Sequence, residues 1–172
     1  MRFVVLIGAS GSGKTSIARA IEQRFENEIR VFYFDRIGVP PAGRMIASHG
    51  SGEAWQRAKT FEWIAKLAPL STAGHGLLFE GQTRLAFLAE AMEAAGIAVY
   101  SPILVDCDDA TRAQRLYRDR QQPELADKDM MNWADWLRRD ARKRGCDILD
   151  TSEFVLDRCV DYVMERLRQN SP

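Results

Sequence analysis

The sequence GASGSGKTS, residues 8–16, contains three of the chain's twelve glycines within six positions. It matches the pattern G-x-x-x-x-G-K-[ST], which ends here at Lys14 and Thr15, and in which a glycine-rich turn presents backbone N–H groups to phosphate oxygens. The pattern is specific only between a strand and a helix. The apolar run FVVLIG, at 3–8, precedes it, and apolar residues follow Lys14 at intervals of three and four. The sequence therefore predicts a strand, a phosphate-binding loop and a helix.

Each part of this loop has an expected role toward ATP and Mg²⁺. Lys14 reaches the β- and γ-phosphates and is a catalytic candidate, the Thr15 hydroxyl ligates Mg²⁺, and the N-terminus of the helix adds partial positive charge. The nucleotide-binding residues that we expect from the loop are Gly8, Ser10, Gly11, Ser12, Gly13, Lys14, Thr15 and Ser16.

Strands and helices alternate along the rest of the chain. Helical patterns separate the apolar runs, and this alternation predicts a parallel sheet with helices on both faces. We interpret residues 36–52 as loop, and we expect Pro102 to make the fourth strand irregular. The further strands are predicted at 30–35, 76–81, 97–106 and 146–150, with helices near 58–68, 85–92, 109–120, 130–141 and 156–167.

Composition limits the function classes. The 172 residues suit one domain, and 24 Lys and Arg balance 24 Asp and Glu, so no overall positive field favours binding of a long nucleic acid. The three cysteines show no metal-ligand spacing and no disulfide framework, which favours a cytoplasmic location. The first apolar run is far too short to span a membrane and lacks a signal-peptide cleavage pattern.

The loop and its flanking elements resemble the P-loop kinases of small molecules, a group that includes nucleoside monophosphate, shikimate and gluconate kinases. The order of elements over the whole chain agrees. The resemblance implies an α/β, three-layer P-loop NTPase fold with a five-stranded parallel sheet in the order 2-3-1-4-5, helices on both faces and a short lid. It implies one kinase domain over residues 1–172, an acceptor-binding segment at about 36–70, a lid at about 118–142, and ATP with Mg²⁺ as cofactors.

Asp35 ends the second predicted strand, at the edge where open α/β sheets bind ligands. In similar kinases an Asp at this point binds or deprotonates the acceptor hydroxyl, so Asp35 is a catalytic and substrate-binding candidate, with Arg36 beside it. A carboxylate that caps the following turn is the alternative. An acceptor that is itself a phosphate needs no base.

Glu80 ends the third predicted strand, where a P-loop protein places an acid that holds Mg²⁺ directly or through water. It is our metal-ligand candidate, with a base or a structural role as alternatives. The run EGQTR, 80–84, also resembles the D-G-F-P-R stretch of adenylate kinases. That resemblance makes Gly81, Gln82 and Arg84 substrate-binding candidates, with Arg84 gripping an acceptor phosphate; an ordinary surface cation is the alternative for Arg84.

Arginines gather in the segment that the resemblance assigns to the lid. The RLYR run most resembles the lid-entry arginines, so Arg115 is a catalytic and nucleotide-binding candidate and Arg118 a catalytic one. We expect at least two arginines of the segment to contact ATP or the acceptor and stabilise the transferring phosphoryl group. The alternative for each single arginine is a solvent-exposed position on a helix face without a functional contact. The arginines are Arg112, Arg115, Arg118, Arg120, Arg138, Arg139 and Arg142.

Two further positions receive interpretations of their own. Trp55 begins an amphipathic helix, and its spacing favours a core position. Thr151 or Ser152 suits the N-cap of the last helix, in a turn that lies against adenine in similar kinases.

These observations favour an ATP- and Mg²⁺-dependent phosphotransferase with a small acceptor. The EGQTR run and the arginines favour a nucleoside monophosphate as the acceptor. The position of Asp35 permits a hydroxyl acceptor instead, such as a sugar acid, a shikimate-like acid or an antibiotic. The alternatives are a nucleotide-binding switch or ATPase, and an end kinase of nucleic acids. The guanine-binding pattern N-K-x-D does not occur in the sequence, and oligomeric state stays open.

Overall fold

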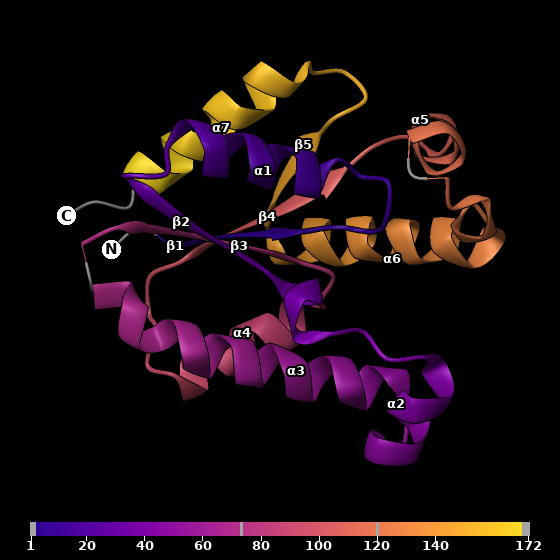
Figure 1. Ribbon diagram of the computed structural model, residues 1–172, viewed down its shortest axis with the longest axis horizontal. Helices are drawn as coiled ribbons and strands as arrows, with labels where there is room; N and C mark the ends of the chain where they lie inside the picture. Colours follow the sequence, from indigo (N-terminus) through magenta and orange to yellow (C-terminus); the bar gives the residue numbers. More distant parts are fainter. Residues whose placement is uncertain (1–2, 73, 120, 170–172) are drawn as a thin grey trace.

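The computed structural model describes residues 3–72, 74–119 and 121–169. Figure 1 shows a central sheet between two layers of helices. The sheet order is β2-β3-β1-β4-β5, and every neighbouring pair is parallel. The predicted fold class and strand order are therefore confirmed. The strands are β1 (Phe3–Ile7), β2 (Ile29–Tyr33), β3 (Gly76–Gly81), β4 (Ser101–Asp106) and β5 (Asp147–Asp150).

The sheet has a separate apolar core on each face. Successive side chains of a strand point to opposite faces, and β1 is buried at every position. Its residues Phe3, Val5 and Ile7 enter one core, whereas Val4 and Leu6 enter the other. A continuous apolar run was therefore the correct signal for a strand that is covered on both sides.

Each core is closed by its own group of helices (Figure 1). The first core lies under α3 (Gly52–Leu67), α4 (Leu85–Ala94) and α6 (Lys128–Arg144). The second lies under α1 (Lys14–Arg24) and α7 (Leu156–Gln169). No helix in the described part of the chain is long and apolar enough to cross a membrane.

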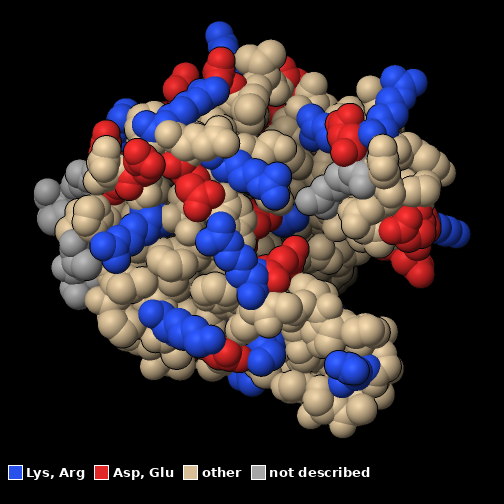
Figure 2. Space-filling view, in the orientation of Figure 1, with Lys and Arg blue, Asp and Glu red and all other residues tan. Residues whose placement is uncertain are grey.

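The parallel strands all end at one edge of the sheet. In Figure 1 this edge faces α2 (Ala42–His49) and α5 (Asp109–Gln114), and Figure 2 shows the surface hollowed between them. The register pairs Leu6 with Glu80 and Tyr33 with Glu80. The loop after β1, Glu80 and Asp35 after β2 are thereby brought together.

The prediction of a loop over 36–52 was wrong in part. The segment contains α2 and the start of α3, which Ser51 caps by accepting a hydrogen bond of 3.0 Å from the Ala54 N–H. A short 3-10 helix, Phe34–Ile37, precedes them. None of the α2 residues is buried, although Met45 packs against the first core. The prolines just before the helix and the glycines within and after it favour a loop, which is why the segment reads as one in the sequence.

Two element boundaries also differ from the prediction. The fourth strand begins at Ser101 rather than 97, because Ile97 follows Gly96 and its N–H closes the end of α4 by donating to the Met92 carbonyl. The helix predicted over 109–120 is α5 followed by one π-helical turn, Arg115–Asp119. Arg120 lies outside the described residues.

Candidate nucleotide and acceptor site

The phosphate-binding loop joins β1 to α1, as the sequence predicts, and its glycines have steric reasons. A Cβ on Gly8 would lie 2.3 Å from the Val105 carbonyl oxygen, so a larger residue cannot fit there. Gly11 and Gly13 adopt φ values of 77° and 91°, in the left-handed region that favours glycine. The turn that these residues allow ends at Lys14, the first residue of α1.

Two loop side chains meet Glu80. The Thr15 hydroxyl donates a hydrogen bond of 3.0 Å to Glu80 Oε1, and Lys14 Nζ lies 3.5 Å from the same oxygen. The side chains of Lys14 and Glu80 are both buried. Partial burial strengthens this pair relative to a surface ion pair, and it fixes the direction of the lysine.

The Thr15 hydroxyl and the Glu80 carboxylate suit Mg²⁺, which prefers oxygen ligands. Among the described residues, no group of three or more His, Cys, Asp or Glu side chains is placed to hold a metal ion. A site with one or two protein oxygens is the arrangement in which Mg²⁺ keeps waters and takes its other ligands from substrate phosphates. The donor set therefore fits a metal that arrives with a nucleotide.

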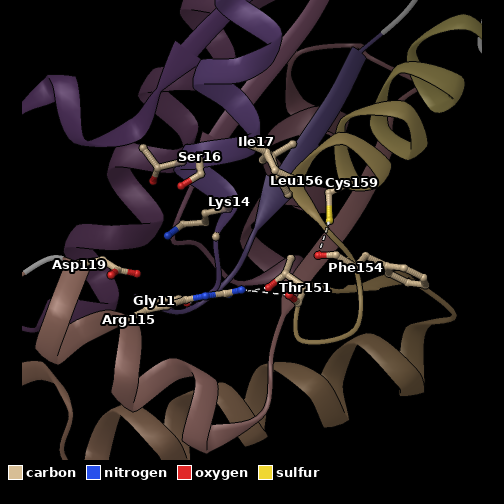
Figure 3. Close-up of a pocket in the computed structure, with 12 residues that line it drawn as sticks. Gly11, Lys14, Ser16, Ile17, Arg115, Asp119, Thr151, Phe154, Leu156 and Cys159 are labelled. Atoms are coloured by element: carbon tan, nitrogen blue, oxygen red, sulfur yellow. Dashed lines mark hydrogen bonds between the residues drawn. The ribbon is translucent and has the colours of Figure 1, made fainter.

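A cavity of about 310 Å³ opens beside the loop. Figure 3 shows Lys14 and Ser16 on its loop side, and Phe154, Leu156 and Cys159 on the other. One end thus offers cationic and hydroxyl groups and the other end apolar surface, as the phosphates and base of a nucleotide require. The cavity is lined by Gly11, Gly13, Lys14, Thr15, Ser16, Ile17, Arg115, Asp119, Thr151, Phe154, Leu156 and Cys159.

Arg115 lines this cavity, as the sequence predicts. Its guanidinium donates to the Thr151 hydroxyl at 2.7 Å and to the Thr151 carbonyl at 3.0 Å, and a longer bond of 3.4 Å reaches the Gly11 carbonyl (Figure 3). These hydrogen bonds keep the Arg115 guanidinium next to the phosphate-binding loop, where the side chain lines the cavity.

The other predicted lid arginines lie elsewhere in the described structure. Arg118 is exposed and does not line the cavity, and Arg139 and Arg142 are exposed on α6. Arg112 is fully buried, and Arg138 binds Asp106. The predicted lid, 118–142, includes most of α6, where Ala134, Leu137 and Ala141 belong to the core.

Asp35 is exposed and opens into a second cavity of about 340 Å³, which it shares with Glu80 and Thr15. Tyr33, Glu22 and Arg36 line this cavity and contact one another. Tyr33 donates a hydrogen bond of 2.7 Å to Glu22, and the Arg36 guanidinium lies 4.6 Å above the Tyr33 ring. Burial raises the pKa of Tyr33, and its bond to Glu22 raises it further, so the phenol stays a donor.

Arg84 lies at the N-cap position of α4, between an acid and an aromatic wall. It pairs with Glu53 at 2.9 Å, and its guanidinium lies 4.8 Å from the centre of the Trp136 ring and 5.5 Å from that of Phe87. Trp136 stacks on Trp133 at 5.2 Å. These contacts hold the Arg84 guanidinium between Glu53 and the aromatic rings.

Gly81 and Gln82 have partners within the chain. A Cβ on Gly81 would lie 2.6 Å from the Phe34 Cβ, so packing of the 3-10 helix already requires a glycine at this position. The Gln82 carbonyl accepts a hydrogen bond of 2.9 Å from the Gln56 side chain. Trp55 is buried, which confirms its predicted place in the core.

The predicted N-cap of the last helix was wrong, because α7 begins only at Leu156. Thr151 instead donates its hydroxyl to the Ser12 carbonyl of the loop at 2.8 Å, and Ser152 accepts a bond of 2.8 Å from the Asp108 N–H. Sequence reasoning missed this role because the Thr151 contact spans 139 positions.

Comparison with solved structures agrees with this arrangement. Shikimate kinase from Acinetobacter baumannii, in complex with shikimate, superimposes with a TM-score of 0.65 and 14% identity over 99% of this chain and 95% of that one. The tunicamycin resistance protein of Deinococcus radiodurans gives 0.66 and 17% over 97% and 96%. The APS kinase of Mycobacterium tuberculosis, in complex with AMPPNP and APS, gives 0.63 and 18% over 97% and 98%.

The chain has the fold of the small-molecule P-loop kinases. Its sequence matches no family model and no curated protein. Likeness at this level of identity establishes the P-loop kinase fold, and the roles of individual residues rest on the geometry described above.

Proposed function

We propose that this protein is an ATP- and Mg²⁺-dependent phosphotransferase that moves the γ-phosphoryl group of ATP to a hydroxyl of a small molecule. One observation carries the proposal. Lys14 and Thr15 meet the same oxygen of Glu80, and the cavity beside them also contains Asp35. Groups suited to phosphate, metal and acceptor thus lie at one edge of the sheet.

The ATP side is the loop and the first cavity. The loop amides and Lys14 hold the phosphates, and the apolar end with Phe154 and Leu156 takes the base. Thr15 and Glu80 would hold Mg²⁺, which would supply positive charge to the phosphate oxygens. Arg115, fixed against Thr151, adds positive charge beside the loop.

On the acceptor side, Asp35 serves as the base. The acceptor oxygen bonds to the γ-phosphorus as the bond between that phosphorus and the bridging oxygen breaks, and ADP leaves with the electron pair. The hydroxyl proton passes to the Asp35 carboxylate. This role is supported by the cavity that Asp35 shares with Thr15 and Glu80.

A hydroxyl acceptor has more support than a nucleoside monophosphate. The lean toward a monophosphate rests on Arg84, which pairs with Glu53 and stacks on Trp136, so an incoming phosphate would have to replace Glu53. A hydroxyl acceptor uses Asp35 in its observed position. The shikimate kinase among the compared structures binds shikimate, which agrees with an acceptor of this class.

The test is acceptor-dependent ADP release with Mg-ATP, measured in parallel with hydroxy acids, sugars, nucleosides, antibiotics and nucleoside monophosphates. The proposal predicts strong stimulation by one hydroxyl compound and none in a Lys14→Ala variant. ATP hydrolysis that no acceptor stimulates would favour a nucleotide switch or ATPase instead.

A further inference from the structure

A fully buried arginine lies under the phosphate-binding loop. Arg112, on α5, has no exposed surface and is one of the largest buried side chains in the protein. A buried charge is costly unless partners satisfy it, so its contacts show what holds it there. The sequence predicted a lid arginine at this position, and the structure gives it a different place.

Arg112 shares one carboxylate with a second arginine. Asp106, the last residue of β4, is buried and accepts from Arg112 Nη2 at 2.6 Å through Oδ1. Its other oxygen, Oδ2, accepts from Arg138 Nε at 2.6 Å. Arg138 lies on α6, so a single carboxylate joins β4, α5 and α6.

The other end of the Arg112 guanidinium reaches the loop itself. Arg112 Nη1 donates to the Ser10 carbonyl oxygen at 2.8 Å. The described peptide bonds include no cis form, and in a planar trans peptide the carbonyl and the next N–H point in opposite directions. Holding the Ser10 carbonyl toward Arg112 therefore turns the Gly11 N–H away from it, and Gly11 lines the nucleotide cavity.

The next two loop carbonyls are held in the same way. The Gly11 carbonyl accepts from Arg115 at 3.4 Å, and the Ser12 carbonyl accepts from the Thr151 hydroxyl at 2.8 Å. Arg115 and Thr151 line the cavity, whereas Arg112 holds the Ser10 carbonyl from beneath the loop. The Ser12 N–H donates to the Ala9 carbonyl at 3.3 Å, so the N–H groups that these carbonyl contacts orient for an anion are those of Gly11 and Gly13. Arg112 is the member of this group whose side chain is fully buried and ion-paired.

We propose that Arg112 is a positioning residue for the nucleotide, which orients the Gly11 N–H by holding the Ser10 carbonyl and is itself fixed by Asp106. The inference rests on the proposed function, because it assigns a role at the same ATP site. Arg112 touches neither nucleotide nor acceptor. Removing the Arg112 guanidinium weakens phosphate binding, because the peptide between Ser10 and Gly11 must then be ordered each time ATP binds.

The experiment measures the dissociation constant of the full chain for a fluorescent ATP analogue with Mg²⁺, together with thermal unfolding. Arg112→Met removes the donor and should weaken nucleotide binding roughly tenfold or more. Arg112→Lys keeps a cationic donor group and should recover part of that loss. The KM for the acceptor should stay unchanged, a split that a general loss of stability would not produce.

A matched control removes an ion pair of similar length away from the loop. Arg166, on α7, binds Asp147 at 2.8 Å, so Arg166→Met should lower the unfolding temperature without changing nucleotide affinity. If Arg112→Met does not fold, Asp106→Asn replaces it, because this variant keeps the size of the side chain while removing the charge that fixes Arg112.

The outcomes separate the two proposals. Nucleotide affinity within twofold of wild type in a folded Arg112→Met or Asp106→Asn chain overturns the positioning role and leaves the phosphotransferase intact. Wild-type protein that binds no ATP analogue overturns both. Weakened binding in the Arg112 and Asp106 variants, with the Arg166 control unchanged, supports the positioning role.

Discussion

The Thr15 hydroxyl donates a hydrogen bond of 3.0 Å to Oε1 of Glu80, a residue 65 positions later in the chain. Parallel pairing of β1 with β3 makes this contact, because Leu6 is paired with Glu80 and the loop follows β1 directly. The contact places a hydroxyl and a carboxylate oxygen where Mg²⁺ and a nucleotide phosphate would meet them.

Glu80→Gln tests the metal role, because it keeps the size and removes the charge. We expect the turnover number to fall by roughly 100-fold or more, since the metal loses an anionic partner. Binding of an ATP analogue in the presence of EDTA should stay close to wild type. Turnover that remains near wild type across a Mg²⁺ titration would contradict a metal-side role for Glu80.

Asp35→Asn tests the base. The amide keeps the shape and cannot accept the hydroxyl proton, so we expect kcat to fall by about 10²- to 10⁴-fold with the affinity for ATP unchanged. Steady-state kinetics with the identified acceptor measures this split. Parallel loss of ATP affinity and kcat would instead point to a structural role at the end of β2.

Glu53→Gln tests whether Arg84 receives an anionic group of the acceptor. In the structure the Glu53 carboxylate pairs with the Arg84 guanidinium at 2.9 Å, and an incoming anion must replace that carboxylate. For an acceptor with a carboxylate or phosphate, we expect KM to fall roughly two- to fivefold, the size of an exposed ion pair. A rise in KM would show that the pair serves to hold the acceptor site in shape.

The cysteine thiols should make the free energy of unfolding depend on pH in the alkaline range. Burial raises the pKa of Cys146 from 9.0 to about 11, and burial also raises the pKa values of Cys107 and Cys159. The folded chain then holds thiol protons that the unfolded chain releases, so stability is fully present below pH 9 and falls as the pH rises toward about 11.

Chemical denaturation at several pH values measures this dependence. Cys146→Ser should reduce the loss of stability between pH 9 and 11, because it removes one of the groups responsible. A stability that stays constant over this range would contradict the raised thiol pKa values. Native protein should also react slowly with a thiol reagent at pH 8 and rapidly after unfolding.

The fold could be predicted largely from local signals. The apolar run of β1 and the positive φ values of Gly11 and Gly13, 77° and 91°, are local properties of the chain. By contrast, α2 is flanked by Pro40, Pro41 and Gly50, residues typical of loops, and the helix was therefore missed.

The site could be predicted where a residue directly follows a strand. Glu80 ends β3 and Asp35 follows β2 within two residues, so the topology of the sheet places both at its carboxyl edge. The arginines depend on contacts across long stretches of sequence. Arg112 meets Ser10 over 102 positions, and no local pattern distinguishes its buried place from that of exposed Arg118.

The fate of the γ-phosphoryl group tests the central claim most directly. The chain would be incubated with Mg²⁺, ATP labelled in the γ-phosphate and the acceptor that most stimulates ADP release, and the products would be separated. We expect label in a phosphate ester of the acceptor, lost in Lys14→Ala and strongly reduced in Asp35→Asn. Label that appears only as inorganic phosphate, whatever acceptor is supplied, would contradict a phosphotransferase.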